Sequence, residues 1–554
     1  MDNGEILKRY EALYSERKGT IEQDWQQIDR YVVPGRSDFY SELGSEHEVE
    51  RGRRELYDST APKGAKRLAA RMHSDLTSSS QTWFEIRFRD EDLNERDDSK
   101  EWIDEVTNII YSAINESNFN VEISEAYLDL TSYGTCVLIQ ELDDKTDKLN
   151  FTAIPVREIY FEEDDKKQVA KLYRRLQWTP LQIVSRFGRD NVPERIQKLA
   201  DDASSSAQRE DVIFAIYPRE VSDDLDTSKP IAPKARPYAF KYILKNGALT
   251  IGEEGGFYEM PAYVTRWLKM AGTRWGKSPA IDAMGDILTL NKLVEATLEA
   301  TGKAVDPATM SEAGNVIGDL DLRQGGHTTV TDIDGLRVIE SGSNFQAGEL
   351  SINRLVNSIR EEFLQDKLEL KDSPAMTATE ANIRYELMQS ALGSTFERIK
   401  TDLLDPLINR SFTILYRAGK LPEIPEGLDG ANMEIEYSGP MARAQRNDAA
   451  NAVKQYLRET AELAEIYPEL LDLVDVDGAG RLVASSSGVP AKALRSVEEV
   501  EELRKSRAEQ QQAMQQAQQA EQMGNAMGAI GEGGQAMAEV PPEMQQALAS
   551  VGGG

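Results

Sequence analysis

Two long amphipathic segments, separated by residues 303–347, constrain most strongly what this chain can fold into. The first begins at Ser278-Pro279, where serine is a good helix N-cap and proline suits the first helical position. The second, from residue 348 to 370, has a narrow apolar face. The apolar positions are Ile281, Met284, Leu288, Val294 and Leu298 in the first segment and Ile352, Leu355, Val356, Ile359 and Phe363 in the second. This spacing predicts helices at 278–302, ending at Gly302, and at 348–370, whose narrow stripes need neighbours.

A short insert and a polar loop are expected at the two ends of this helix pair. Residues 303–347 are rich in Gly, Thr and Asp, and short apolar runs such as Leu336-Arg337-Val338-Ile339 predict small strands and turns. After the second helix, Lys371-Asp372-Ser373-Pro374-Ala375 predicts a loop at residues 371–375, because proline cannot continue a helix. The segment as a whole therefore predicts an elongated helical hairpin.

A third helix is expected directly after the loop. Thr377 and Glu380 have the spacing of a capping box, which satisfies free backbone amides at a helix start. The helix is expected to run to about Ala418. Pro406 should kink or interrupt it, because proline lacks an amide hydrogen and clashes with the preceding turn.

The regions on either side of the hairpin predict a mixed α+β fold. Before it, we expect helices to about Val32 and at 61–77, 100–117, 121–130, 180–187 and 193–200, and strands at 83–88, 135–141, 149–154, 169–176, 212–217, 238–244 and 263–267. The strands at 135–141, 149–154 and 169–176 are expected to form one antiparallel meander. After the hairpin, we expect a strand at 433–437, helices at 442–466 and 496–523, and a mobile tail at 524–554.

Composition narrows the classes of function. The formal net charge of −31 argues against a protein that grips nucleic acid over its whole surface. It is compatible with a protein that lets DNA slide past, because an acidic wall repels phosphates. The single cysteine, Cys136, lies in an apolar strand-like run and is expected to be a buried thiol. No apolar run reaches the roughly 18 residues that span a bilayer, and the N-terminus does not have the pattern of a signal peptide, so we expect no membrane partner.

Residues suited to catalysis or metal binding are sparse. His47, His73 and His327 lie in different polar contexts, and none is at ligand spacing with another His or Cys. Asp475-Val476-Asp477-Gly478 is similar to the start of a calcium loop, but the later ligand positions are missing. The sequence therefore predicts a protein that is not an enzyme and needs no metal or cofactor.

One expected helix, at 61–77, carries a group of basic residues. Lys63, Lys66, Arg67 and Arg71 have the charge to contact phosphate. The alternative is a solvated face or a set of ion pairs between subunits. This alternative is favoured, because the segment has no interleaved aromatic residues and belongs to an acidic chain.

The segment Ala271–Ser278 matches a relaxed nucleotide-binding loop pattern, with alanine in the first glycine position. Against a phosphate site, Pro279 removes an amide at the helix start, and Arg274 and Trp275 are bulky where amides should converge. A structural turn into the first long helix is therefore the favoured interpretation, and a P-loop-like ATPase is kept as the alternative.

Five motifs in one order resemble portal proteins of short-tailed, podovirus-type bacteriophages, also called head-to-tail connectors. Gly272–Pro279 resembles the family's turn into its stem helix, so Gly276, Lys277, Ser278 and Pro279 correspond to the start of the stem. The other four motifs are Gln81-Thr82-Trp83-Phe84, Met376-Thr377-Ala378-Thr379-Glu380, Ser438-Gly439-Pro440-Met441-Ala442-Arg443-Ala444-Gln445, and Gly488-Val489-Pro490 with Arg495-Ser496. The resemblance spans about residues 5–520.

The resemblance implies a ring of twelve subunits at one capsid vertex, assembled in the host cytoplasm and retained in the virion. The implied regions are a wing at 1–277 and 376–435, stem helices at 278–302 and 348–370, a clip at 303–347, a channel loop at 371–375, a crown at 436–495, a C-terminal barrel helix at 496–523 and a tail at 524–554. The implied partners are double-stranded DNA, bound without sequence specificity, the terminase large subunit, a tail adaptor, and the scaffolding and major capsid proteins. Packaging energy would come from the terminase.

The channel loop suggests a gate for DNA. Lys367 and Lys371 would contact phosphates, with Asp372, Ser373 and Pro374 completing the loop. An equally weighted alternative is that both lysines are ordinary surface residues paired with Asp366 and Asp372. A non-viral helical scaffold or adaptor is the remaining alternative for the whole chain.

Overall fold

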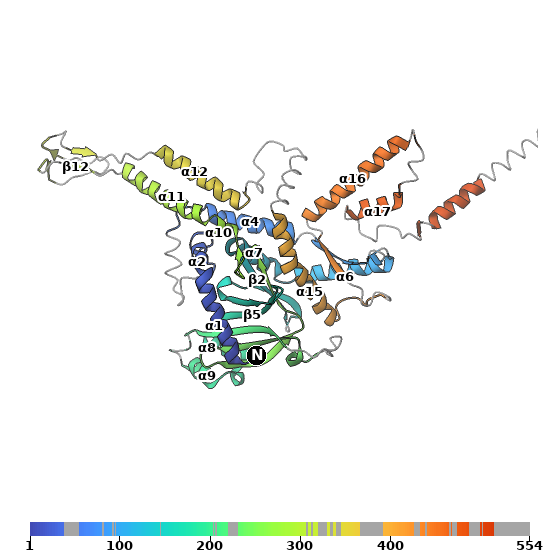
Figure 1. Cartoon of the computed structure of the whole chain (residues 1–554), viewed down its shortest axis with the longest axis horizontal. Helices are drawn as coiled ribbons and strands as arrows, with labels where there is room; N and C mark the ends of the chain where they lie inside the picture. Colours follow the sequence, from blue (N-terminus) through green and yellow to red (C-terminus); the bar gives the residue numbers. More distant parts are fainter. Residues whose placement is uncertain are drawn as a thin grey trace, which may run out of the picture. The chain divides into compact units, whose positions relative to one another are not determined.

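The computed structural model describes residues 1–37, 55–79, 82–90, 93–94, 96–143, 146–202, 204, 206, 208–219, 231–305, 309–311, 314–318, 329–332, 336–338, 345–365, 392–425, 433–437, 440–464, 467, 474–486, 499–500 and 502–514. The chain forms two compact units. The first comprises residues 1–90 and 102–445, and the second comprises residues 91–101 and 446–554. Both contain helices, and the first contains all the strands described, so the fold class is α+β, as predicted (Figure 1).

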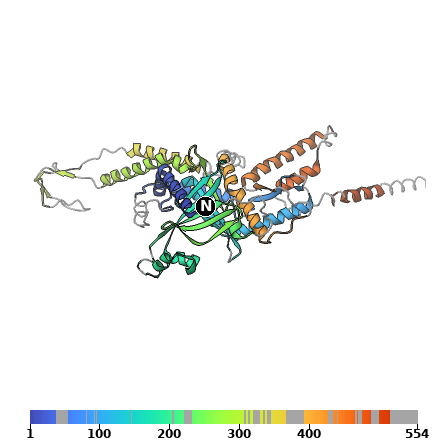
Figure 2. The ribbon, with the colours of Figure 1, turned by 60° about the horizontal axis from the view of Figure 1, so that its bottom comes forward.

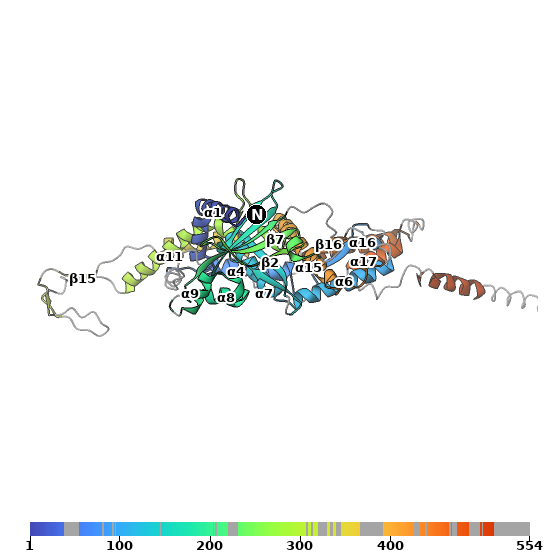
Figure 3. The ribbon, with the colours of Figure 1, turned by 90° about the horizontal axis from the view of Figure 1, so that it is seen from below.

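A five-stranded antiparallel sheet forms one layer of the first unit. Its strands follow chain order: β4 (Ile159–Glu163), β5 (Val169–Trp178), β6 (Glu210–Pro218), β7 (Tyr238–Leu244) and β8 (Leu249–Phe257). Helices α8 (Pro180–Phe187) and α9 (Glu194–Asp201) connect β5 to β6 and lie together (Figure 3). Helix α1 (Asn3–Thr20) packs Ile6, Tyr10 and Leu13 onto Tyr160, Tyr173 and Ile213 of the sheet. The sheet is therefore anchored to the N-terminal helix.

A three-stranded sheet, in the order β3-β2-β9, combines two strands that precede the five-stranded sheet in the chain with one that follows it. It contains β2 (Thr135–Asp143), β3 (Lys148–Ala153) and β9 (Ala262–Arg266). The prediction that strands 135–141, 149–154 and 169–176 form one meander is wrong, because β5 pairs with β4 and β6 in the other sheet. The short strand β4 and the glycine-containing strand β8 had not been predicted. Asn246 and Gly247 lie in the turn between β7 and β8.

The helices before these sheets follow the sequence with one exception. The helix expected to run to Val32 is two helices, α1 and α2 (Glu22–Tyr31), because the backbone breaks at Ile21. Helices α4 (Thr60–Leu76), α6 (Asp97–Asn115) and α7 (Phe119–Tyr133) occur where helices were expected. Helix α4 packs against α7 through its small and apolar face.

The predicted helical hairpin is present in the first unit. It consists of α10 (Pro279–Asp282), α11 (Met284–Val305) and α12 (Phe345–Glu362), and α11 and α12 run side by side (Figure 2). The insert forms two small antiparallel pairs, β12 (Thr309–Ser311) with β15 (Leu336–Val338) and β13 (Val316–Ile317) with β14 (Thr329–Val330). Gly302 does not end the first helix as expected. It is exposed within α11, where an isolated glycine costs only about 1 kcal/mol.

Pro406 interrupts the third helix as predicted. Residues 392–399 are α-helical, Lys400–Leu404 form a π-helical turn, and α15 (Asp405–Arg417) follows with Pro406 in its first turn. The π turn accommodates the missing amide of Pro406, because the proline then falls where a helix needs no amide donor. Gln140 Nε2 donates a hydrogen bond to Ser411 Oγ at 2.8 Å, which ties α15 to β2. Strand β16 (Met433–Tyr437) pairs with β1 (Phe84–Phe88).

The second unit is helical in its described part. Helix α16 (Pro440–Ala464) leads into it, followed by α17 (Val476–Ser486) and a helix at 502–514. Asp475 Oδ1 accepts hydrogen bonds from the amides of Asp477 and Gly478, at 3.1 and 2.9 Å. The segment that is similar to a calcium loop is therefore the N-terminal cap of α17.

Candidate functional site at the base of the helix pair

The helix pair begins at a close backbone crossing between two glycines. Gly276 belongs to a short hairpin in which β10 (Leu268–Lys269) pairs with β11 (Gly276–Lys277). A Cβ atom at Gly276 would lie 1.9 Å from the carbonyl oxygen of Gly134, and Gly134 ends α7 with φ +77°. The Gly276 amide donates to Thr135 Oγ1 at 2.9 Å. Both glycines are required here, because any side chain would force the two backbones apart.

Ser278 caps the first helical turn and also fixes it to the body of the unit. Its Oγ accepts a hydrogen bond from the Ile281 amide at 3.1 Å and donates one to the Ser132 carbonyl at 2.5 Å. Pro279 occupies the first turn, and Lys277 forms an ion pair with Asp282. The four residues predicted at the helix start, Gly276, Lys277, Ser278 and Pro279, therefore lie together against the end of α7.

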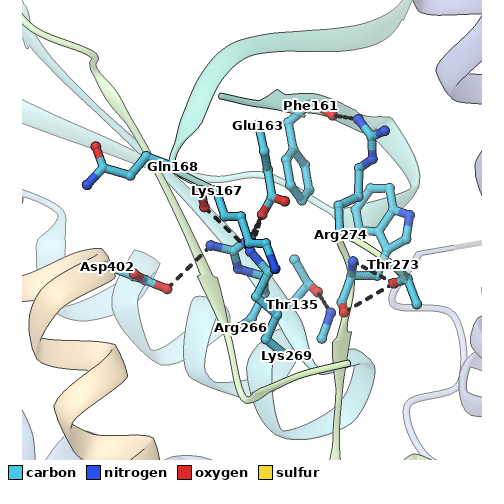
Figure 4. A network of polar contacts seen from close by, with 12 residues as sticks. Thr135, Phe161, Glu163, Lys167, Gln168, Arg266, Lys269, Thr273, Arg274 and Asp402 are labelled. Atoms are coloured by element: carbon cyan, nitrogen blue, oxygen red, sulfur yellow. Dashed lines mark hydrogen bonds and ion pairs between the residues drawn. The ribbon is translucent and has the colours of Figure 1, made fainter. Parts of the chain in front are cut away.

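Trp275 anchors the loop of the hairpin in the core. Its ring is 2% exposed and packs edge-to-face on Trp25 and Phe161, with ring centroids 4.9 and 4.8 Å apart. The neighbouring Arg274 donates to the Phe161 carbonyl at 2.6 Å and pairs with Glu16 at 2.9 Å. Figure 4 shows this arrangement of Arg274 and Phe161. Aromatic packing and ion pairing together hold the loop against α1, α2 and β4.

A partly buried charge network connects the base of the helix pair to the π turn. Arg266 of β9 is 5% exposed and lies between Glu163 of β4 and Asp402 of the π turn, 3.7 Å from the latter (Figure 4). Lys269 of β10 also pairs with Glu163, at 2.6 Å. Burial raises the pKa of the Asp402 carboxyl, and the charge of Arg266 opposes this rise. The network joins four elements, and its residues had not been identified from the sequence.

The two long helices contact each other through a narrow stripe. Ser358 Oγ donates to Asp286 Oδ2 at 2.6 Å, and Ile359 and Phe363 are buried. Phe363 lies over Gly64 of α4, where an added Cβ would be 2.8 Å from its ring. Burial, and then the charges of Asp282 and Asp286, raise the pKa of the Glu362 carboxyl.

The burial of the helix pair decreases along α11. Met284, Ile287 and Leu290 are buried, whereas residues 301–305 are all exposed. Large apolar side chains are exposed in the second half of the pair and on the small strands: Leu298 at 56%, Val305 at 81%, Met310 at 52%, Ile317 at 60% and Leu350 at 73%. Exposed apolar side chains concentrated in one region indicate a surface that another protein covers.

Several predicted site residues lie outside the described residues. They are the channel-loop residues Lys367, Lys371, Asp372, Ser373 and Pro374, and the helix-cap residues Thr377 and Glu380. Their roles stay predictions. Cys136 is buried, as expected, and burial raises the pKa of its thiol well above the usual value.

The geometry of residues 271–278 argues against a nucleotide site. The amides of Trp275 and Gly276 donate to Thr273 Oγ1 and Thr135 Oγ1, both at 2.9 Å, so they do not converge on an open cradle. The Lys277 ammonium pairs with Asp282. Among the described residues, no group of three or more His, Cys, Asp or Glu side chains could hold a metal ion, and no described helix is long and apolar enough to cross a membrane.

Known proteins similar to this chain come from bacteriophages. Residues 3–494 match the family described as bacteriophage head to tail connecting protein. The chain is 28% identical over 496 residues to the "Probable portal protein" of Bordetella phage BPP-1, and the alignment covers 87% of each chain. It is 25% identical over 502 residues to the "Portal protein" of Salmonella phage epsilon15, again over 87% of each.

Proposed function

Because the chain belongs to the family of bacteriophage head-to-tail connecting proteins and has the function of a phage portal protein at the head–tail junction of the virion, we propose that twelve copies form a ring at one capsid vertex. Double-stranded DNA passes through this ring during packaging and ejection. The ring is a passive conduit and docking platform without catalytic activity, and a terminase supplies the energy of packaging.

The observation that carries this proposal is the helix pair α11–α12. The pair has a narrow buried stripe, while Leu298, Val305 and Leu350 remain exposed in the isolated subunit. In a ring, neighbouring subunits cover these side chains, and the polar faces line a wet channel. If residues 278–302 and 348–370 form the stem of a ring, neighbouring subunits cover the apolar side chains that a single subunit leaves exposed.

The remaining regions are assigned by the same family relationship. The wing comprises residues 1–277 and 376–435, the crown 436–495, the C-terminal barrel helix 496–523, and the tail 524–554. The clip at 303–347 docks the terminase large subunit and later the tail adaptor, and the ring assembles with the scaffolding and major capsid proteins in the host cytoplasm. The exposed Met310 and Ile317 give the clip an apolar docking surface.

A charge introduced on the apolar surface of the stem tests the subunit contact. Leu298→Glu places a charge on the exposed apolar surface of α11 and should strongly reduce ring formation, measured as particle mass by light scattering. Lys292→Glu, on the exposed polar face of the same helix, is the matched control and should leave the ring intact. If both variants form rings equally well, the exposed stripe of α11 is not a subunit contact.

The clip and the channel loop need separate tests. Replacing residues 309–338 by a short Gly-Ser linker should abolish binding of the terminase large subunit while the ring persists. Reversing the charges of Lys367 and Lys371 should change DNA retention or packaging yield without changing ring assembly. Unchanged packaging in the second variant would refute a gate formed by the channel loop at 371–375.

A further inference from the structure

The exposed face of α4 is basic within an acidic chain. Lys63, Lys66, Arg67 and Arg71 are all exposed, and the opposite face of the helix is buried. The helix has one carboxylate, Asp75, against these four cations, whereas the whole chain has a formal net charge of −31. The local reversal of charge marks this face, which we call the α4 basic face, as different from the surrounding surface.

The spacing of the α4 basic face suits a row of phosphates. Lys63, Lys66, Arg67 and Arg71 lie at positions i, i+3, i+4 and i+8, so they form one stripe about 12 Å long at a rise of about 1.5 Å per residue. Duplex DNA carries one negative charge per about 1.7 Å of its axis. Ala70 is the other exposed residue between Lys63 and Arg71, and it is small and not aromatic. The stripe can therefore contact phosphates but cannot stack on bases.

The lysines of this face are available for a partner. Arg71 pairs with Asp75 at 2.6 Å, but within the described part of the chain no carboxylate pairs with Lys63 or Lys66. Lysine is a compact point charge that needs no bidentate geometry, which suits transient contact with a moving phosphate backbone. A stable ion pair between subunits is better served by arginine.

The buried side of α4 packs against the end of the helix pair. Gly64 is buried, and its contact with Phe363 seats the end of α12 on this side of α4. The helix pair is the element that lines the DNA channel in the proposed function. The basic face is on the other, exposed side of the same helix, about one helix diameter of about 10–12 Å from the end of α12, and its long lysine side chains extend outward from there.

We propose that the α4 basic face binds the phosphate backbone of duplex DNA, without sequence specificity, as a contact surface additional to the channel loop. The proposal rests on the proposed portal function. It replaces the interpretation of this stretch as a solvated face or a set of ion pairs between subunits.

The test is the salt dependence of duplex binding by the purified, assembled protein. A fluorescent 30-base-pair duplex of random sequence is titrated with the protein from low to moderate salt. The double variant Lys63→Glu/Lys66→Glu should reduce the slope of log K against log[salt] by about 1.8, at about 0.9 per phosphate contact, and should weaken binding about tenfold at low salt. The control Lys8→Glu/Lys198→Glu has the same change of charge at two exposed lysines away from α4, and should retain the wild-type slope.

A cross-linking experiment provides a second readout. Because Cys136 is buried, a photoreactive thiol reagent can be attached selectively at Ala70→Cys on the basic face or at Ser185→Cys on α8. The probe at residue 70 should cross-link to the duplex, and the probe at residue 185 should not.

Three results would overturn the proposal. The double lysine variant could bind DNA with the slope of its control, the probe at residue 70 could cross-link only to a neighbouring subunit, or the double variant alone could lose the ring. Ring mass is measured on the same samples. A wild-type protein that forms no ring would contradict the portal architecture, whereas the comparison of slopes would still decide whether α4 contacts DNA.

Discussion

Substituting Gly276 by alanine tests whether the glycine crossing fixes the helix pair. The new Cβ would lie 1.9 Å from the Gly134 carbonyl oxygen and 3.0 Å from the Cβ of Arg266; Gly134 is held between α7 and β2, and Arg266 belongs to β9. Overpacking of this kind costs typically 1–3 kcal/mol, and the hydrogen bond from the Gly276 amide to Thr135 adds about 1 kcal/mol if it breaks. The expected loss of unfolding free energy is about 3 kcal/mol.

Urea unfolding followed by near-ultraviolet circular dichroism measures this loss, because Trp275 packs edge-to-face on two aromatic rings beside the substituted residue. At a slope of about 3 kcal/mol per molar urea, the midpoint should fall by about 1 M. Gly285→Ala in α11 is the matched control. A Cβ there meets nothing within 4 Å, so the variant should gain about 0.5–1 kcal/mol. A Gly276→Ala midpoint equal to that of wild type would refute the role of the crossing.

Three further predictions concern charged groups around the same base. Arg266→Met removes the cation between Glu163 and Asp402. It should lower the unfolding free energy by about 3 kcal/mol in the same urea assay. An unchanged urea midpoint would mean that the network does not stabilise the fold. Burial raises the pKa of Asp129 from 3.8 to about 6 although Arg36 pairs with it, so the folded state binds this proton more tightly than the unfolded state. The stabilising contribution is complete below pH 3.8 and is lost as the pH rises through 6. Relative to Asp129→Asn, wild type should therefore gain about 2 kcal/mol of unfolding free energy between pH 7 and 4. A relative loss would show that the ion pair with Arg36 dominates. For Lys277→Ala, neither the variant nor wild type should bind a fluorescent ATP analogue, and binding by wild type that the variant loses would restore the ATPase alternative.

Local periodicity predicted the helices well, and its errors have physical causes. The stripe predicted for the second helix is confirmed: Ile359 of α12 and Phe363, which directly follows α12, are buried, while Asn353, Arg354 and Arg360 are exposed. In the first helix, Leu298 was placed on the stripe but is exposed, while Ile287 and Leu290 are buried and had been missed. Leu298 lies about four helical turns after the buried Met284 on the same face of α11, and it is exposed because the burial of the helix pair decreases toward the small strands.

Long-range partners could not be predicted from the sequence. Gly134 and Gly276 are separated by more than 140 residues, and neither position has a local pattern that identifies the other. The same holds for Arg266, Glu163 and Asp402, whose charges meet only after two sheets and the π turn have packed. Ser278 and Pro279, in contrast, were predicted correctly, because capping depends on neighbouring residues.

The most direct test of the portal architecture is the mass of the purified wild-type protein by light scattering, with images of the same sample. The proposed function predicts a particle of about 743 kDa, twelve times the subunit mass of 61.9 kDa, with a central hole. A monomer or dimer without a hole, at several protein and salt concentrations and also after co-expression with a scaffolding protein, would contradict it.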